Sequence, residues 1–313
     1  MTVKSRKSPA VTSERRVGGG RDAMQGCRDV MRFVGTAVLL LMGGMTVAGC
    51  ETNPYTGRSQ LLMTSISQEM QLGEQAYAQV KSDPNIRLAR DPREVEPVKR
   101  VAARIIEAAK RSKYAEMAKQ FEWEVTVIKD DRTANAFALP GGKIAVYTGI
   151  FPVARTEAGL AAVMGHEVIH ALARHGAERM SQGQLTNAAL QVAGAAIGAS
   201  GGNPLLGQAT MAALGLGAQV GVLLPFSRKH ESEADYVGIL LAADAGYDPR
   251  ESVGLWERMA ELSSGGGPAE FLSTHPSHGT RIEQLKAWMP EAMAIYQKRT
   301  PAPNGLLPPV GNQ

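Results

Sequence analysis

The segment from residue 165 to residue 170 carries side chains that could bind a metal ion and activate water. Its sequence GHEVIH places His166 and His170 four residues apart, with Glu167 directly after the first histidine. In a helix this spacing sets the two imidazoles roughly 40° apart around the axis, so both can reach one ion while the glutamate lies beside bound water. The competing interpretation is a pair of helix-surface histidines beside an unrelated glutamate.

A catalytic zinc site uses three protein ligands, so the pattern requires a third donor elsewhere in the chain. We expect this donor to be Glu231, in the segment SRKHESEAD at residues 227–235. Asp235 lies one helical turn beyond Glu231, where its carboxylate could accept the outer N–H of a liganding histidine and raise that ligand's basicity. Without the upstream motif, both carboxylates would be interpreted as solvated helix charges.

Other histidines and acids near these motifs are expected to have no part in catalysis. His175 lies nine residues beyond the first histidine of the motif, roughly 180° around a continuous helix. We therefore expect it to point away from the ion, as a surface or helix-capping residue. His230 and Glu233 are expected to face other sides of the later helix, and His278 is expected at the surface.

These motifs together resemble the peptidase M forty-eight family of gluzincins, and within it the periplasmic lipoprotein members of the LoiP, BepA and HtpX type. Residues 135–142 (NAFALPGG) resemble the edge strand that the family places beside its cleft, and THP at 274–276 followed by Arg281 resembles its carboxy-terminal pair. The similarity extends over about residues 53–288. It implies a zincin fold, one Zn²⁺ per chain and endopeptidase activity on unfolded or membrane-associated proteins.

The expected chemistry is hydrolysis of a peptide bond. The zinc would lower the pKa of its bound water and polarise the scissile carbonyl, while Glu167 accepts the water proton and passes it to the leaving amine. By the resemblance, Arg281 would stabilise the oxyanion of the tetrahedral intermediate. His275 would either orient the substrate or occupy the open zinc position and hold the enzyme latent.

An extended substrate could add to the predicted edge strand through main-chain hydrogen bonds, which would make cleavage tolerant of sequence. Pro140 suits an edge, because proline cannot donate to an inner ladder. The alternative for this stretch is an ordinary β-hairpin. The strand residues expected to contact substrate are Asn135, Ala136, Phe137 and Ala138.

Helices and one small sheet must position these side chains. Apolar periodicity predicts helices over about 66–80, capped by Ser65 or Ser67, over 92–110, and over 156–179. Alternation of apolar and polar residues predicts three strands, at 121–129, 135–139 and 144–148. The sequence thus predicts an α+β, zincin-like fold, mostly helical, with a small sheet whose edge strand lines the active-site cleft.

The amino-terminal segment resembles an export signal. Residues 33–50, FVGTAVLLLMGGMTVAGC, lack charge and follow Arg28 and Arg32. Their end resembles a bacterial lipobox, in which Cys50 would be acylated and anchor the protein to a membrane. By resemblance to sorted lipoproteins, Glu51 in place of an aspartate favours the outer membrane, so we expect an exported, lipid-anchored protein facing the periplasm. The alternative is a plain transmembrane anchor.

Charged residues are distributed unevenly along the chain. Of 34 basic and 30 acidic residues, eight and three fall in residues 1–49, so the remainder is nearly neutral; with 5% aromatic residues this argues against a nucleic-acid partner. Residues 180–227 contain no charged residue or histidine. We interpret them as two packed helices over the cleft, which could touch lipid, rather than as a transmembrane hairpin. The expected regions are a leader (1–49), a linker (50–64), a metallopeptidase domain (65–299) and a flexible tail (300–313).

These expectations describe a membrane-anchored zinc metalloendopeptidase that hydrolyses unfolded or misassembled envelope and outer-membrane proteins in protein quality control. Its partners would be those substrates, the membrane and the outer-membrane assembly machinery. The alternative is a proteolytically silent, zinc-containing chaperone or assembly adaptor. Glu167 argues against silence, because a structural zinc site closes with four ligands and needs no base.

Overall fold

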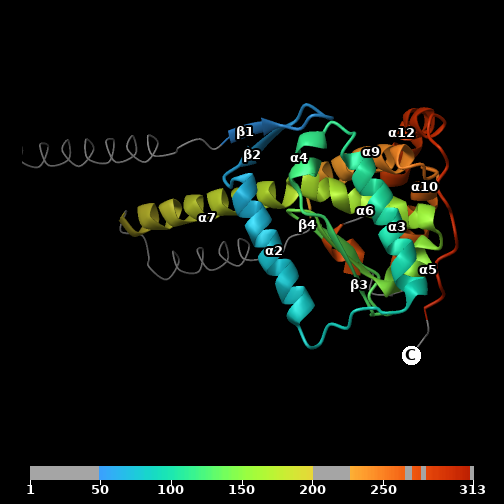
Figure 1. Cartoon of the computed structure of the whole chain (residues 1–313). Helices are drawn as coiled ribbons and strands as arrows, with labels where there is room; N and C mark the ends of the chain where they lie inside the picture. The colour runs from blue at the N-terminus through green and yellow to red at the C-terminus, as the bar shows by residue number, and fades with distance from the viewer. Residues whose placement is uncertain (1–48, 200–225, 265–269, 276–279, 311–313) are drawn as a thin grey trace, which may run out of the picture. The chain divides into compact units, whose positions relative to one another are not determined.

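A computed structural model describes residues 49–199, 226–264, 270–275 and 280–310 of the chain (Figure 1). The predicted leader therefore lies outside the described residues, apart from Gly49. In chain order the elements are β1 (Gly49–Thr52), β2 (Ser59–Leu62), α2 (Ile66–Ser82), α3 (Pro92–Ala109), α4 (Ala115–Gln120), β3 (Glu124–Ile128), β4 (Ala136–Leu139), β5 (Lys143–Tyr147), η1 (Thr148–Ile150), α5 (Phe151–Ala154), α6 (Glu157–Leu172), α7 (His175–Ala199), α9 (Arg228–Asp244), α10 (Glu251–Ser264), α11 (Glu270–Thr274) and α12 (Arg281–Tyr296).

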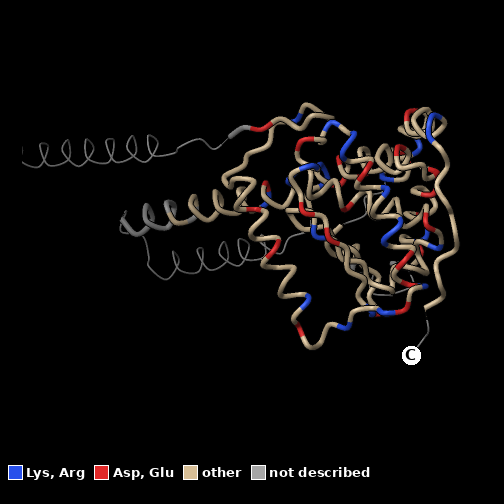
Figure 2. Tube along the Cα trace, viewed as in Figure 1, with Lys and Arg blue, Asp and Glu red and all other residues tan. Residues whose placement is uncertain are grey.

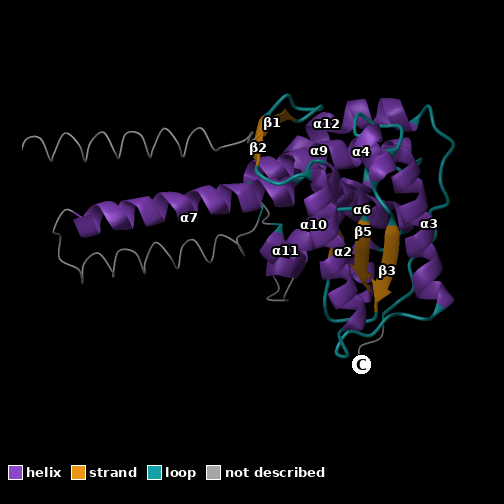
Figure 3. Ribbon diagram, turned by 60° about the vertical axis from the view of Figure 1, so that its left-hand side comes forward, coloured by secondary structure: helices purple, strands orange, loops and turns teal. Residues whose placement is uncertain are grey.

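Three of the strands form one small mixed sheet in the order β3-β5-β4. β3 runs parallel to β5, β4 runs antiparallel to β5, and β4 is an edge strand. Gly141 and Gly142 join β4 to β5 with φ of 84° and 87°, a conformation that glycine adopts without steric cost. Helix α3 contacts β3, helix α6 contacts β4, and helix α2 contacts β4 and β5. Figure 3 shows α2 and α3 near the strands of this sheet. The predicted α+β, zincin-like fold is confirmed.

The helices on either side of the sheet begin where local chemistry favours it. Ser65 caps α2 in a capping box: its side chain accepts the backbone N–H of Gln68, whose side chain returns to the Ser65 backbone. Asp91 caps α3, which starts at Pro92, a residue with the φ of the first helical turn. The predicted helices at 66–80 and 92–110 are thus observed.

The buried centre of the domain is the crossing of α6 and α9. Every residue of α6 is buried. At the crossing, a Cβ on Gly165 would lie 2.8 Å from the backbone oxygen of Gly238, and a Cβ on Gly238 would lie 3.0 Å from the backbone nitrogen of His166. The two helices therefore meet backbone to backbone, which is possible only because both positions are glycine.

The predicted helix over 156–179 is two helices rather than one. α6 ends at Leu172, Arg174 has a φ of 57°, and α7 begins at His175. Contacts with distant residues stabilise this turn, because the Arg174 guanidinium donates to Glu69 Oε1 at 2.6 Å and to the Thr64 carbonyl at 2.8 Å. The break changes the direction in which every side chain after residue 174 points.

Two segments outside the predicted metallopeptidase domain also make defined contacts. The expected linker forms the antiparallel pair β1–β2, and backbone hydrogen bonds join residues 302–307 of the expected tail to the domain. In the tail, the Gly305 carbonyl accepts the Glu157 backbone N–H at 3.0 Å, and Asn304 Oδ1 accepts that of Ala158 at 2.9 Å. These acceptors satisfy N–H groups of the first turn of α6, which have no partner inside the helix.

Helix α7 extends away from the body of the domain (Figures 1 and 3). Beyond its first turns it carries no charged residue, as Figure 2 shows, in agreement with the uncharged stretch noted in the sequence. Among the described residues, no helix is both long and apolar enough to cross a membrane. The second half of that stretch, residues 200–225, lies outside the described residues, so lipid contact stays a hypothesis.

Candidate metal centre

Side chains from α6, α9 and the end of α11 converge on one buried point. α6 contributes His166 and His170, α9 contributes Glu231, and His275 follows the last residue of α11. Each of these side chains is at most 3% exposed. Together they form a cluster whose four donor atoms lie within 4.8 Å of one another.

The spacing of these donors fits a tetrahedral zinc ion, whose ligand atoms would lie about 3.3 Å apart at bond lengths of about 2.0 to 2.1 Å. His166 Nε2 lies 3.1 Å from His170 Nε2 and 3.2 Å from His275 Nδ1. Glu231 Oε1 lies 3.4 Å from His170 Nε2 and 3.0 Å from His275 Nδ1. Three ring nitrogens and a carboxylate this close together could hold a zinc ion, because each can offer one lone pair to the cation.

Burial and charge tune the protonation of these groups. Burial would raise the pKa of Glu231, but hydrogen bonds with His166, His170 and His275 hold it well below its usual range. Burial lowers the pKa of His170 well below its ordinary value. Burial also acts to lower the pKa of His166, but hydrogen bonds to Asp235 and Glu231 outweigh this effect and raise it to about 9. An ionised carboxylate and an unprotonated His170 are the forms that bind a cation.

Asp235 and Arg281 contact the predicted ligands His166 and Glu231. Asp235 Oδ1 lies 2.9 Å from His166 Nδ1, the ring nitrogen that faces away from the cluster. The guanidinium of Arg281 is 1% exposed, donates to Asp235 Oδ1 at 2.7 Å, and lies 3.1 Å from Glu231 Oε2. Its carbon also stacks 3.2 Å above the Trp256 ring. Arg281 thus contacts the carboxylates of the centre; its role toward an oxyanion stays a prediction.

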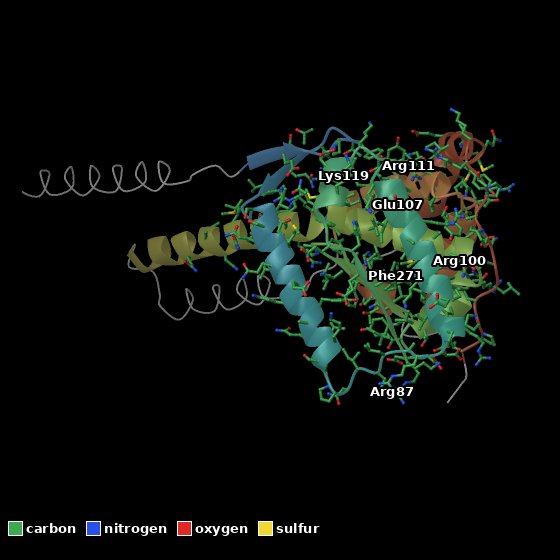
Figure 4. The ribbon with its side chains drawn as sticks, viewed as in Figure 1. Arg87, Arg100, Glu107, Arg111, Lys119 and Phe271 are labelled. Carbon is green, nitrogen blue, oxygen red and sulfur yellow. The ribbon has the colours of Figure 1, made fainter. Side chains whose placement is uncertain are left out.

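Two phenyl rings enclose the imidazole of His275. Phe271 stacks on it at a centroid distance of 4.5 Å and Phe226 at 5.3 Å, and the Phe226 ring also lies 4.0 Å from that of His170. Figure 4 labels Phe271, which is fully buried. The backbone N–H of Phe226 donates to the Thr274 carbonyl at 3.1 Å. The sequence analysis missed Phe226; its position directly before the cap of a ligand-bearing helix is the signal that could have indicated it.

Glu167 lies beside the donor cluster and is also buried. Its Oε1 lies 3.5 Å from His275 Nε2 and has no hydrogen-bond partner among the described residues. Burial raises the pKa of this carboxyl. A buried carboxylate with a free oxygen and a raised pKa is suited to accept a proton near neutral pH.

The prediction that His175 is a surface residue is wrong. The chain turns at Arg174, and α7 begins at His175 with a different axis from α6. The side chain of His175 therefore points into the domain and is 0% exposed. His175 Nδ1 lies 3.1 Å from His170 Nδ1, and its Nε2 lies 3.1 Å from Glu233 Oε2. Burial lowers the pKa of His175 to about 4, although Glu233 acts to raise it.

His230 and Glu233 lie outside the donor cluster, as predicted, and both are buried. His230 Nε2 lies 3.1 Å from Glu178 Oε2, and Arg58 donates to both Glu178 and Glu233. The chain has only six histidines in 313 residues. The five that the structure describes lie either in the metal centre or in the adjoining group of His175, His230, Glu178 and Glu233. The rarity of histidine could therefore have indicated that His175 and His230 lie near the metal centre. His278 lies outside the described residues.

The predicted substrate strand lies next to α11. The backbone N–H of Phe271 donates to the Ala134 carbonyl at 3.3 Å, just before β4, which contains Ala136, Phe137 and Ala138. Asn135 precedes β4, and its carbonyl accepts the Tyr147 N–H at 3.0 Å. Substrate binding along this strand stays a prediction. Cys50, the residue that the sequence predicts to be acylated, lies in β1.

Comparison with known proteins gives a family and several relatives. The model of Peptidase family M48 matches residues 92–289. The chain is 38% identical over 242 residues to the mitochondrial metalloendopeptidase OMA1 of Schizosaccharomyces pombe, covering 76% of this chain and 66% of that protein. It is 34% identical over 254 residues to the human mitochondrial metalloendopeptidase OMA1 (79% and 47%). It is 28% identical over 260 residues to the β-barrel assembly-enhancing protease of Escherichia coli strain K12 (80% and 51%).

The chain spans about two thirds of the length of the fission yeast relative and about half of the other two. The relatives that are 34% and 38% identical are named as mitochondrial proteins. They contradict the location predicted from the leader, so the expectation of a lipid-anchored periplasmic protein at the outer membrane is wrong. Basic residues near the amino terminus occur in secretory signals and in mitochondrial transit peptides, so they do not by themselves identify the compartment.

The predicted family is confirmed by these matches. The four donors at the crossing of α6 and α9 fit the zinc that M48 metalloproteases use. The family match and the names of the relatives both support a metalloendopeptidase. The chain therefore belongs to Peptidase family M48, the zinc metallopeptidases.

Proposed function

We propose that this chain hydrolyses peptide bonds inside unfolded or misassembled proteins, using the centre built on His166, His170 and Glu231. The observation that carries the proposal is Glu167, a buried carboxylate with a free oxygen beside a zinc donor set. A structural zinc site has no use for such a base, which disfavours a silent chaperone. The name of the Escherichia coli relative, an assembly-enhancing protease, supports misassembled proteins as the substrate class.

When bound, zinc supplies a Lewis acid and lowers the pKa of water. Glu167 accepts the proton of the attacking water and passes it to the leaving amine. Its raised pKa and its Oε1, which has no hydrogen-bond partner among the described residues, suit this role. Asp235 keeps the His166 imidazole oriented, and Arg281 holds Asp235 and Glu231 in place. An extended substrate lies along the edge of β4, at the point where α11 joins it.

We further propose that the chain in this form is latent. His275 Nδ1 takes the fourth place among the donors, and its Nε2 lies beside Glu167, so one side chain occupies both the position of the substrate carbonyl and the approach to the base. Phe226 and Phe271 hold the ring there. Activity therefore requires His275 to leave this position.

The test uses zinc-loaded protein and fluorescently labelled casein as an unfolded substrate. We expect His275→Ala to cleave faster than wild type, and Glu167→Gln in the His275→Ala background to lose at least about 100-fold in rate while keeping its zinc. Zinc content by elemental analysis, and loss of cleavage on chelation, complete the comparison. Cleavage by the Glu167→Gln double variant at the rate of His275→Ala alone would refute the assignment of the base.

A further inference from the structure

The outer nitrogen of His170 is bound by a second histidine rather than by a carboxylate. His166 presents Nε2 to the donor cluster and Nδ1 to Asp235. His170 also presents Nε2 to the cluster, but its Nδ1 lies 3.1 Å from Nδ1 of His175. The far nitrogen of His175 then lies 3.1 Å from Glu233 Oε2. A continuous chain of contacts therefore leads from the donor cluster through two imidazoles to a carboxylate.

The hydrogen positions along this chain follow from the carboxylate. Arg58 donates to both oxygens of Glu233, and Thr56 donates to Oε1, so Glu233 is an ionised acceptor. His175 must then carry its hydrogen on Nε2 and offer the lone pair of Nδ1. That lone pair accepts the N–H of His170 Nδ1, which leaves Nε2 of His170 unprotonated and able to bind a cation.

We propose that His175 and Glu233 are positioning residues that hold His170 in the tautomer that binds the metal. This inference rests on the proposed function, because it concerns the same metal centre. Asp235 orients His166 by direct contact with its Nδ1. In this proposal Glu233 orients His170 in the same way, but through the ring of His175. Neither residue touches the donor cluster's centre, so both act only through His170.

The amino-terminal hairpin takes part in this arrangement. Arg58, in the turn between β1 and β2, donates to Glu233 Oε2 at 2.7 Å and to Glu178 Oε1 at 2.6 Å. Gln60 of β2 donates to Glu178 Oε2 at 3.0 Å and to the Ala173 carbonyl at 2.8 Å, in the turn between α6 and α7. The hairpin thus fixes the two carboxylates on α7 and α9 relative to the end of the ligand-bearing helix.

The test compares Glu233→Gln with a matched variant, Glu157→Gln, in the full chain. Glu157 is also a buried carboxylate bound by an arginine, with Arg100 Nη2 at 2.6 Å, but it lies at the opposite end of α6 from His170. Arg100 is labelled in Figure 4. We expect Glu233→Gln to lower the affinity for zinc about 10- to 100-fold, measured by competition with a chelator, and Glu157→Gln to leave it unchanged.

A second pair of variants separates tautomer control from general support of the fold. In His175→Asn the amide oxygen takes the place of Nδ1 and can accept from His170, so zinc affinity should stay within about threefold of wild type. Adding Glu233→Gln to that variant should cause no further loss, because the chain of contacts is already cut. A merely structural role for Glu233 would instead produce the same loss in both backgrounds.

The outcomes distinguish this inference from the proposed function. Long-range proton–nitrogen spectra of histidine-labelled wild type should show His175 as the neutral Nε2–H tautomer. A wild type that binds zinc while Glu233→Gln binds it equally well, or a His175 that carries its hydrogen on Nδ1, would overturn the inference and leave the proposed function standing. A wild type without affinity for zinc would refute the proposed function, and the tautomer measurement would still decide the assignment of His175.

Discussion

The contact between Gly165 and Gly238 sets the distance between the two helices that carry the ligands. A Cβ on Gly165 would lie 2.8 Å from the Gly238 oxygen, whereas ordinary van der Waals contact begins at 3.4 Å. Replacing Gly165 with alanine therefore requires α6 and α9 to separate by about half an ångström at the crossing. Metal–ligand distances tolerate about 0.2 Å. We expect Gly165→Ala to weaken zinc binding at least about tenfold.

The same substitution has two opposing effects on stability. Overpacking costs about 1 to 3 kcal/mol, while replacing a helical glycine with alanine contributes up to about 1 kcal/mol. The free energy of unfolding should therefore fall by up to about 2 kcal/mol, which lowers Tm by several degrees in a domain of this size. Chelator competition measures the affinity, and calorimetry of the zinc-loaded protein measures Tm.

Gly183→Ala is the control, because a Cβ at Gly183 in α7 would meet nothing within 4 Å. This variant should gain up to about 1 kcal/mol and keep the zinc affinity of wild type. If Gly165→Ala behaved like Gly183→Ala in both measurements, the argument that close backbone approach positions Glu231 against the histidines would be refuted.

Two further predictions follow from the packing and charge around the centre. Phe226→Ala removes one of the two rings that enclose His275, an aromatic contact worth about 0.5 to 1.5 kcal/mol, so cleavage of casein by otherwise wild-type protein should rise up to about tenfold; an unchanged rate would contradict a role of Phe226 in latency. Burial acts to raise the pKa of Glu178, but hydrogen bonds with His230 and Arg58 outweigh it and hold the pKa well below its usual range. The resulting stability is present above the unfolded pKa of about 4.3 and is lost as the pH falls below it, so urea unfolding at pH 6 and pH 3.5 should differ less in Glu178→Gln than in wild type.

Local patterns predicted those parts of the structure that depend on neighbours in the sequence. The spacing of His166 and His170, the helix cap offered by Ser65 and the glycine turn at Gly141 are short-range features, and the structure contains each of them. Glu231 could be identified because zinc requires a third ligand, which is a chemical constraint rather than a local one.

The turn between α6 and α7 could not be predicted in the same way. Arg174 adopts a positive φ, which is uncommon for a residue other than glycine, and its guanidinium is held by Glu69 and by the Thr64 carbonyl, more than 100 residues earlier in the chain. Nothing within α6 itself signals the break. Because His175 was placed by extending that helix, its inward direction and its contact with Glu233 were missed together.

The cap on α6 also affects when the ligand-bearing helix can form. Its first N–H groups are satisfied by Asn304 and Gly305, and the contact with Ala158 spans 146 residues. During synthesis these acceptors are made more than 100 residues after α6 itself, so the helix lacks these hydrogen bonds while the intervening residues are being made. Ribosome-bound chains that end before residue 304 should therefore lack these two hydrogen bonds at the start of the ligand-bearing helix.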